Sequence, residues 1–150
     1  ASEHARIGFV FNKIGIVPEA CSSWFLPRIV GISQALEWVY SADILKPNEA
    51  LEGGFLKAVV PAEQLLDKAY EIAAKIASHS PVAVALTRQM MYRNTAQPDP
   101  VEAHKVDSLA MFYTSTLGGK EGVASFLEKR PANFTDSVNE DMPDFYPWWE

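Results

Sequence analysis

Residues 15–28 read GIVPEACSSWFLPR, and this stretch decides the fold. The apolar residues 14–17 predict a short strand that Pro18 ends. Glu19 follows at the point where a helix is expected to begin, because proline suits the first turn of a helix. The stretch therefore predicts a strand, a turn and a helix arranged around one carboxylate.

Glu19 has mostly apolar neighbours in the sequence, and two interpretations of it stay open. Ile16, Val17, Trp24 and Phe25 lie within six residues of it on either side. If the turn folds inward, loss of water disfavours the ionised carboxylate, which then suits the work of a general base near neutral pH. The alternative is a structural acid in the first turn of a helix, where the helix dipole favours negative charge. Spacing alone favours the structural role.

Apolar residues recur at helical spacing through most of the remaining sequence, which predicts a largely helical chain. Prolines and small polar residues set the expected starts, and glycines or prolines the expected ends. The predicted helices are one ending at Gly31, one from Ser33 through Tyr40, one from Pro47 to Gly53, one from Pro61 to His79, one over residues 81–91, one from about Pro100 through Tyr113, and one over residues 120–130.

Several details within these helices can be tested by the structure. Ser33 is expected to cap its helix, with Leu36 and Tyr40 facing the core. Trp38 is predicted to pack in the core or at an interface. Gly118 and Gly119 are expected to break the chain before the last helix.

Extended segments are predicted at two further places. Ala5, Ile7, Phe9 and Phe11 alternate with other residues at strand period, which indicates a half-buried strand within residues 1–13. The partner strands of this segment are expected to lie outside the sequence. Residues 55–60 predict a second extended segment.

Composition excludes several classes of function. The chain has 150 residues, 48% of them hydrophobic, and a net charge of -6, so it offers no basic field for nucleic acid. It has no apolar run of roughly 20 residues and no signal-peptide pattern at its start. We therefore expect a soluble, cytoplasmic protein with neither a nucleic-acid nor a membrane partner.

Cysteine and histidine usage predicts no metal site. Cys21 is the one cysteine, and the three histidines do not stand at ligand spacing with it. Cys21 is expected to be a small buried filler, since no neighbouring histidine would activate it as a nucleophile. His79 and His104 are expected to be polar helical residues.

Three motifs resemble the crotonase (enoyl-CoA hydratase/isomerase) superfamily. PEACSS at residues 18–23 is similar to the PEGCSS run around the catalytic glutamate of 3-enoyl-CoA to 2-enoyl-CoA isomerases. NEALEGGFLKAVV at residues 48–60 resembles the family's connector, and EGVASFLEKR at residues 121–130 its C-terminal signature. The resemblance covers about half of the usual family length.

The resemblance implies an α/β fold, mostly helical here. Residues 1–60 would form the last turn of a strand-strand-helix spiral with the acid/base site. Residues 61–150 would form a helical oligomerisation region and a tail. The apolar tail over residues 134–150 is expected to pack on this subunit or on a neighbour.

The resemblance also implies chemistry for particular residues. Glu19 matches the isomerase glutamate and would move a proton between two carbons of an enoyl-CoA through an enolate. Family hydratases use two glutamates, one in the N-terminal half and one eight residues before the position of Glu19. The second of these positions holds Phe11 in this sequence, which favours single-base chemistry. Backbone N–H groups of the family's N-terminal half would stabilise the enolate oxygen. Substrate contacts are expected from Ile16, Pro18, Trp24, Phe126 and Lys129.

The implied partners are an acyl-CoA thioester as substrate, with no further cofactor, and the N-terminal half of the same protein. A homo-oligomer is expected, a trimer or a dimer of trimers. Two alternatives stay open. One is an enoyl-CoA hydratase or another acyl-CoA enzyme of the superfamily, and the other is a non-catalytic helical oligomerisation module.

Overall fold

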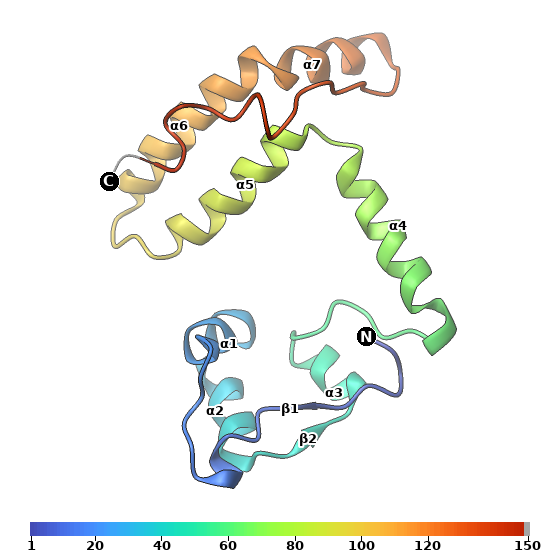
Figure 1. The fold of residues 1–150 in the computed structure, drawn as a ribbon, viewed down its shortest axis with the longest axis vertical. Helices are drawn as coiled ribbons and strands as arrows, with labels where there is room; N and C mark the ends of the chain where they lie inside the picture. The colour runs from blue at the N-terminus through green and yellow to red at the C-terminus, as the bar shows by residue number, and fades with distance from the viewer. Residues whose placement is uncertain (149–150) are drawn as a thin grey trace. The chain divides into compact units, whose positions relative to one another are not determined.

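The computed structural model describes residues 1–148 of the chain. It divides into two compact units, Ala1–Tyr70 and Glu71–Glu150, drawn in Figure 1. The boundary falls inside helix α4, Leu65–Ala77. The boundary predicted at residue 60 separates the part with the acid/base site from the helical region and tail, and it stays a prediction.

The first unit combines a minimal sheet with short helices. Strand β1, Ile7–Gly8, pairs antiparallel with β2, Ile44–Leu45, so that Ile7 lies opposite Leu45. These strands run side by side in Figure 1. The remaining elements are the 3-10 helices η1, Asn12–Ile14, and η2, Ala62–Gln64, and the helices α1, Ser22–Val30, α2, Ile32–Ser41, and α3, Pro47–Glu52.

An aromatic core holds the first unit together. Trp38 on α2 is 3% exposed and packs with Leu26 of α1. Phe9 stacks on the Trp38 ring at 6.0 Å between centroids, and Phe55 meets the Phe9 ring edge-on at 5.6 Å. Such pairs add to the stabilisation from buried area. The prediction that Trp38 is a packing residue is confirmed.

The turn between α1 and α2 depends on one glycine. Gly31 has φ 82°, a conformation that favours glycine, and its N–H donates to the Pro27 carbonyl. Gly31 therefore ends α1 as predicted. It also precedes α2, which begins at Ile32, so the prediction that Ser33 caps this helix is wrong.

The buried face of α2 also differs from the prediction. Leu36 and Tyr40 are 40% and 69% exposed, while Ala35 and Trp38 are buried. Two residues three apart share a helical face, so burying the large Trp38 ring fixes the orientation of α2. Leu36 and Tyr40 are thereby turned away from the core of the first unit.

The predicted strand over residues 14–17 is wrong. Ile14 ends η1, and Gly15 adopts φ 77°. Residues 16–19 then run without a regular element. The left-handed Gly15 redirects the chain, so the apolar run does not extend beside a partner strand.

Two neighbouring segments are less regular than predicted. Residues 55–60 form no named strand, although Val60 bridges Ser2 in parallel. The helix expected from Pro61 begins as η2 and continues as α4. The structure describes all of α4, and none of its residues is buried. Leu66 and Tyr70, for example, are exposed.

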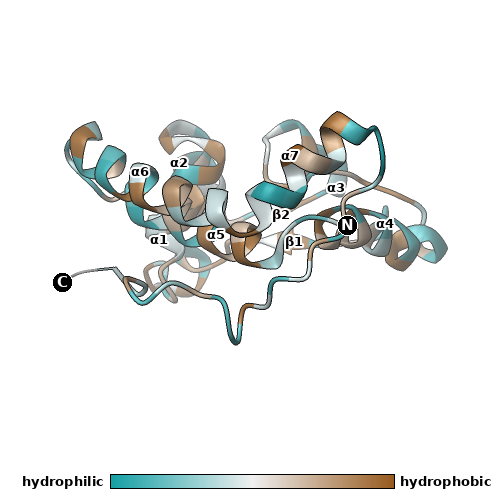
Figure 2. Cartoon of the chain, turned by 90° about the horizontal axis from the view of Figure 1, so that it is seen from above, coloured by the Kyte–Doolittle hydropathy of each residue, from teal (hydrophilic) through white to brown (hydrophobic). Residues whose placement is uncertain are grey.

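The second unit is built on three helices. They are α5, Pro81–Asn94, α6, Pro100–Thr116, and α7, Gly118–Glu128. Figure 1 shows α5 beside α6, and Val82, Leu86, Val106 and Ala110 are the buried apolar residues of this pair. Hydrophobic and hydrophilic residues alternate along the helices in Figure 2, as expected for helices with one buried side.

Local caps explain why α5 and α6 start where the sequence predicts. The Ala83 N–H donates to Ser80 Oγ at 3.2 Å, and the Val101 N–H donates to Asp99 Oδ1 at 2.7 Å. Each cap precedes a proline at the first helical position, where the missing N–H costs nothing.

The break between α6 and α7 lies one residue before the predicted glycines. Leu117 separates the helices, and Gly118 and Gly119 form the first turn of α7. A Cβ on Gly118 would lie 2.9 Å from Ser80 Oγ, and one on Gly119 would lie 2.9 Å from the Thr114 carbonyl oxygen. The glycines are therefore explained by close approach of neighbouring segments.

The tail packs on its own unit as far as residue 148. Tyr113 donates its hydroxyl hydrogen to the Asp141 carbonyl at 3.1 Å and meets the Phe145 ring edge-on at 5.7 Å. Arg93 lies 5.9 Å from the centre of the Trp148 ring. The part of the expected packing that concerns residues 149–150 lies outside the described residues.

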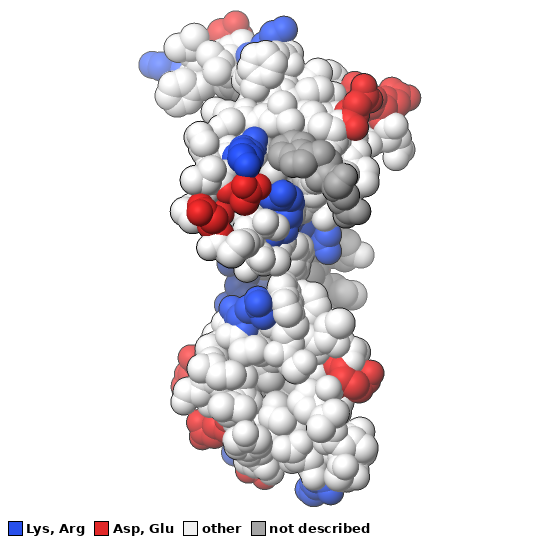
Figure 3. Space-filling view, turned by 90° about the vertical axis from the view of Figure 1, so that its left-hand side faces the viewer, with Lys and Arg blue, Asp and Glu red and all other residues white. Residues whose placement is uncertain are grey.

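Charged side chains of both signs lie on the surface of the protein. On the face in Figure 3, basic and acidic side chains are interspersed among other residues, so no broad basic surface lies there. Within residues 1–148, no helix has both the length and the apolar character needed to cross a membrane.

Candidate active site

Glu19 lies on the turn that leads into α1. The helix begins at Ser22, three residues later than the carboxylate. Both the Ser22 hydroxyl and the Ser22 N–H donate to the Glu19 carbonyl oxygen, at 2.6 and 2.9 Å. The Cys21 carbonyl accepts the Trp24 and Phe25 N–H groups, which starts the helix.

The backbone of this turn is strained at two consecutive positions. Ala20 has φ 50° and Cys21 has φ 59°, in the left-handed region. A residue with a Cβ pays about 1–2 kcal/mol there. These angles delay the helix from Glu19 to Ser22, because neither residue can continue a right-handed helix. Strain of this kind concentrates at functional sites.

The apolar enclosure expected around Glu19 is not formed by the described residues. The Glu19 side chain is exposed. Val17 is 76% exposed, and Ile16 and Phe25 are exposed as well. The reason is that residues 16–19 belong to no helix or strand and do not fold onto the core of the first unit.

An apolar cavity of about 250 Å³ adjoins the turn. Pro18 and Ser22, on either side of Glu19 in the sequence, line it together with Leu26 of α1 and Val39 of α2. Pro18 is half-buried there, whereas Ile16 is not among the lining residues. Pro18 and Ser22 are thus the residues of the turn that adjoin the helices α1 and α2.

Trp24 is half-buried, and other side chains cover part of its ring. The Arg28 guanidinium lies 3.9 Å from the ring centre, and Arg28 Nη1 donates to the Trp24 carbonyl at 3.0 Å. Phe25 meets the ring edge-on at 4.7 Å. A substrate contact with the face under Arg28 would first require this cation to move.

Phe126 and Lys129 belong to the second unit, whereas Glu19 belongs to the first. Phe126 is 82% exposed on α7. Lys129 follows the helix with φ 55°, and its N–H donates to the Phe126 carbonyl at 3.3 Å. The left-handed Lys129 thus ends α7 and lies outside the helix that carries Phe126.

The EGVASFLEKR motif, residues 121–130, contains an ion-pair cluster that the sequence did not predict. Arg130 donates to both carboxylate oxygens of Glu121, at 2.5 and 2.9 Å, and to Glu128 at 2.6 Å. The Asn133 N–H also donates to Glu121, at 2.7 Å. The Arg130 hydrogen bonds, followed by that of Asn133, lower the pKa of Glu121 to about 2. Arg130 and Glu121 stand nine residues apart, a spacing that no helical rule pairs.

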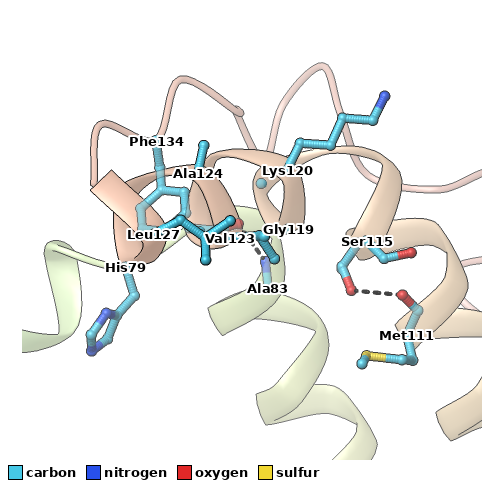
Figure 4. A pocket seen from close by; sticks show the side chains of 14 residues that line it. His79, Ala83, Met111, Ser115, Gly119, Lys120, Val123, Ala124, Leu127 and Phe134 are labelled. Carbon is cyan, nitrogen blue, oxygen red and sulfur yellow. Dashed lines mark hydrogen bonds between the residues drawn. The ribbon is translucent and has the colours of Figure 1, made fainter. Parts of the chain in front are cut away.

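The second unit has a larger cavity of about 790 Å³, shown in Figure 4. Met111 of α6 and Val123 and Leu127 of α7 line it with Phe134 of the tail. Lys120 extends away from the other labelled side chains in Figure 4. The lining is mainly apolar, so the cavity offers packing surface rather than an acid and base pair.

No metal site is found within residues 1–148, where no three His, Cys, Asp or Glu side chains could hold an ion together. Cys21 is exposed, so the expectation of a buried filler is wrong. Its place in the strained turn keeps it away from the core. Glu19 is the one carboxylate of this turn, residues 16–22, and its side chain is exposed.

The comparisons with known proteins identify the family. The profile described as Enoyl-CoA hydratase/isomerase matches residues 1–137. The chain is 41% identical over 145 residues to the Enoyl-CoA hydratase ACTT3 of Alternaria alternata, covering 93% of this chain and 48% of that protein. It is 34% identical over 138 residues to the mitochondrial enoyl-CoA hydratase of Pongo abelii, covering 91% of this chain and 47% of that protein.

Solved structures give the same result. The enoyl-CoA hydratase of Bacillus anthracis superposes with a TM-score of 0.84 at 33% identity, covering 91% of this chain and 53% of that chain. A probable enoyl-CoA hydratase/isomerase of Mycobacterium abscessus gives 0.84 at 27% identity, covering 91% and 54%. This chain spans about half the length of the relatives that it matches. The predicted fold class is confirmed, and the chain belongs to the enoyl-CoA hydratase/isomerase family, aligning with the C-terminal half of the crotonase fold.

Proposed function

We propose that this chain carries the acid/base residue of an enzyme that acts on enoyl-CoA thioesters, and that Glu19 is that residue. The observation that carries the proposal is the exposed Glu19 carboxylate on a strained turn whose backbone is held by Ser22. Family membership supplies the substrate class, since the matched relatives are named enoyl-CoA hydratases.

A carboxylate suits the chemistry of a thioester. The carbonyl acidifies the protons on the neighbouring carbon, and removing one gives an enolate whose oxygen needs hydrogen-bond donors. The base must lie within about 2.6–3.2 Å of the proton that it removes. Glu19 supplies the base, and the donors for the oxygen are proposed to come from the N-terminal half of the family fold.

Within this class we favour a shift of the double bond by Glu19 alone. Glu19 would take a proton from one carbon and return it two carbons away. The support is Phe11, which stands eight residues before Glu19. The family resemblance implies that hydratases have one of their two glutamates at this position and the other in the N-terminal half. A phenylalanine ring cannot activate the water that hydration consumes.

Hydration is the second candidate, and the names of the relatives favour it. ACTT3 and the Pongo abelii protein are both named enoyl-CoA hydratases, at 41% and 34% identity. The two reactions differ in product, since hydration adds water across the double bond and isomerisation only moves it. A direct assay therefore separates them.

The test measures both reactions in the complete protein. With a 3-enoyl-CoA substrate, Glu19→Gln should lower kcat by at least about 1,000-fold, because the amide keeps the size but cannot carry the proton. The matched control is Glu52→Gln, an exposed acid on α3 of the same unit, which should leave kcat unchanged. Faster hydration of a 2-enoyl-CoA than isomerisation by the parent would make hydration the function. Parent-like turnover by Glu19→Gln would remove Glu19 from the mechanism.

Binding and assembly complete the proposal. Lys129 and Phe126 are proposed to contact the CoA moiety, because its phosphates suit a cation and its adenine ring an exposed aromatic surface. Ile16, Pro18 and Trp24 are proposed to contact the acyl part.

The proposed assembly is a trimer or a dimer of trimers that includes the N-terminal half of the family fold.

A further inference from the structure

Ser22 makes two hydrogen bonds to the residue that we propose as the acid/base group. Its hydroxyl and its backbone N–H both donate to the Glu19 carbonyl oxygen, at 2.6 and 2.9 Å. Holding this carbonyl fixes the backbone orientation of Glu19, and with it the direction in which the side chain leaves the backbone. The side chain of Ser22 thus acts on Glu19 through the main chain.

The turn needs such a contact because its own conformation is unfavourable. Ala20 and Cys21, between Glu19 and Ser22, both have positive φ. The exposed Glu19 carboxylate itself receives no hydrogen bond among residues 1–148. Ser22 is half-buried beside Leu26, so its hydroxyl is anchored on α1. The two hydrogen bonds from Ser22 therefore connect the residue that carries this carboxylate to a packed helix.

We infer that Ser22 is a positioning residue for proton transfer by Glu19. The inference rests on the proposed function, because it needs Glu19 to be the acid/base group. Its physical basis is the steep dependence of proton transfer on geometry, in which an error of about 1 Å costs roughly 100-fold in rate. The Ser22 N–H remains in any side-chain variant, so the turn is loosened rather than lost when the hydroxyl is removed.

The first test compares kinetic constants in the complete protein with a 3-enoyl-CoA. Ser22→Ala should lower kcat about tenfold, less than full misplacement costs, with KM unchanged. Ser22→Thr keeps the hydroxyl and should restore most of kcat. The matched control is Ser23→Ala, because the Ser23 hydroxyl makes no hydrogen bond within the described part of the chain. It should behave like the parent.

A second readout separates positioning from a merely structural role. In D2O, a proton held by a loosely placed carboxylate exchanges with solvent before it is returned, so Ser22→Ala should incorporate more deuterium per product than the parent. A variant that is simply less folded makes less product with unchanged deuterium in each molecule. Unchanged deuterium per product in Ser22→Ala would overturn the inference.

Glu19→Gln is measured in parallel so that the two proposals fail separately. If Glu19→Gln is inactive while Ser22→Ala keeps the parent kcat, only the positioning role of Ser22 is refuted. If Glu19→Gln turns over like the parent, the proposed function fails, and the inference fails with it. A loss of kcat in Ser22→Ala that Ser22→Thr does not recover also counts against the hydroxyl.

Discussion

At the scale of single residues, Ala20 adopts a backbone conformation that its side chain disfavours. The left-handed conformation of Ala20, φ 50°, brings its Cβ close to the backbone, and glycine is the residue that adopts it freely. The resembling PEGCSS run has glycine at this position. The alanine therefore adds strain to this turn. The neighbouring residues keep the conformation of the turn, because Ser22 donates a hydrogen bond to the Glu19 carbonyl across it.

Ala20→Gly should raise the free energy of unfolding by roughly 0.5–1 kcal/mol. Relief of about 1–2 kcal/mol of backbone strain exceeds the 0.4–1 kcal/mol that glycine adds to the entropy of the unfolded chain. The control is Ala74→Gly on the exposed surface of α4, which should lower stability by about 1 kcal/mol. Urea unfolding measures both, and equal destabilisation by the two changes would contradict the strain at Ala20.

At the scale of elements, the end of α7 is fastened by charge rather than by core packing. Arg130 joins Glu121, in the first turn of α7, to Glu128 in its last turn. The left-handed Lys129 turns the chain back so that Arg130 reaches both acids. The cluster also orders the start of the tail, because Asn133 donates its N–H to Glu121.

This cluster predicts a loss of stability in acid. The folded pKa of Glu121, about 2, lies below its ordinary value of 4.5, so its contribution is complete above about pH 4.5 and is lost as the pH falls towards 2. The difference in Tm between the parent and Glu121→Gln should therefore be largest near neutral pH and shrink across this range. Circular dichroism melts at pH 7, 4 and 2.5 measure it. A difference that stays constant with pH would show that the charge of Glu121 is not the cause.

A second contact between elements ties the tail to the start of α5. Asp136 Oδ2 accepts from the Ser80 hydroxyl at 2.5 Å and from the Val82 N–H at 3.0 Å. The other oxygen, Oδ1, is buried without a hydrogen-bond partner among the described residues. Both hydrogen bonds between the tail and α5 are thus accepted by one oxygen of this carboxylate.

Asp136→Ala should lower the free energy of unfolding more than Asp136→Asn, because only one of the two carboxylate oxygens makes these contacts. Alanine leaves the Val82 N–H and Ser80 hydroxyl without their acceptor and should cost about 1–3 kcal/mol of unfolding free energy. Asparagine keeps one acceptor oxygen, so it should cost less than alanine. Urea unfolding of both variants measures the order, and equal losses would show that the Oδ2 contacts contribute little.

At the scale of the whole molecule, local signals predicted more than long-range ones. The starts of α5 and α6 follow from a cap and a proline that are adjacent in sequence, and both predictions were confirmed. Residues 14–17 have the composition of a strand, but Gly15 turns left-handed and no partner strand forms there. Composition does not specify the backbone angle of a glycine, so this outcome could not be foreseen.

In the candidate site, too, local features could be predicted from the sequence and long-range features could not. The position of Glu19 beside Pro18, just before a helix, was predictable from the motif. Its exposure was not, because enclosure depends on which segments fold over the turn. The contacts of Ser22 were also missed, although a serine at the start of a helix is a signal for hydrogen bonding to the local backbone.

Assembly is the property of the whole molecule that the exposed apolar residues predict. Met111 of α6 and Val123 and Leu127 of α7 line one cavity and are 70%, 62% and 72% exposed. Apolar surface gathered in this way marks sites of protein association. Homo-oligomers commonly bury such surface against copies of the same chain. We therefore expect the protein to associate through this surface.

Leu127→Asp should shift the protein towards smaller species. A charge buried without a partner in an interface is strongly unfavourable, so the variant should dissociate at concentrations at which the parent is expected to associate. The control is Asn139→Asp, which adds the same charge at an exposed polar residue of the tail and should not change the mass. Light scattering at micromolar concentration measures all three proteins. A monomeric parent would contradict assembly altogether, and an associated Leu127→Asp variant would place the interface elsewhere on the chain.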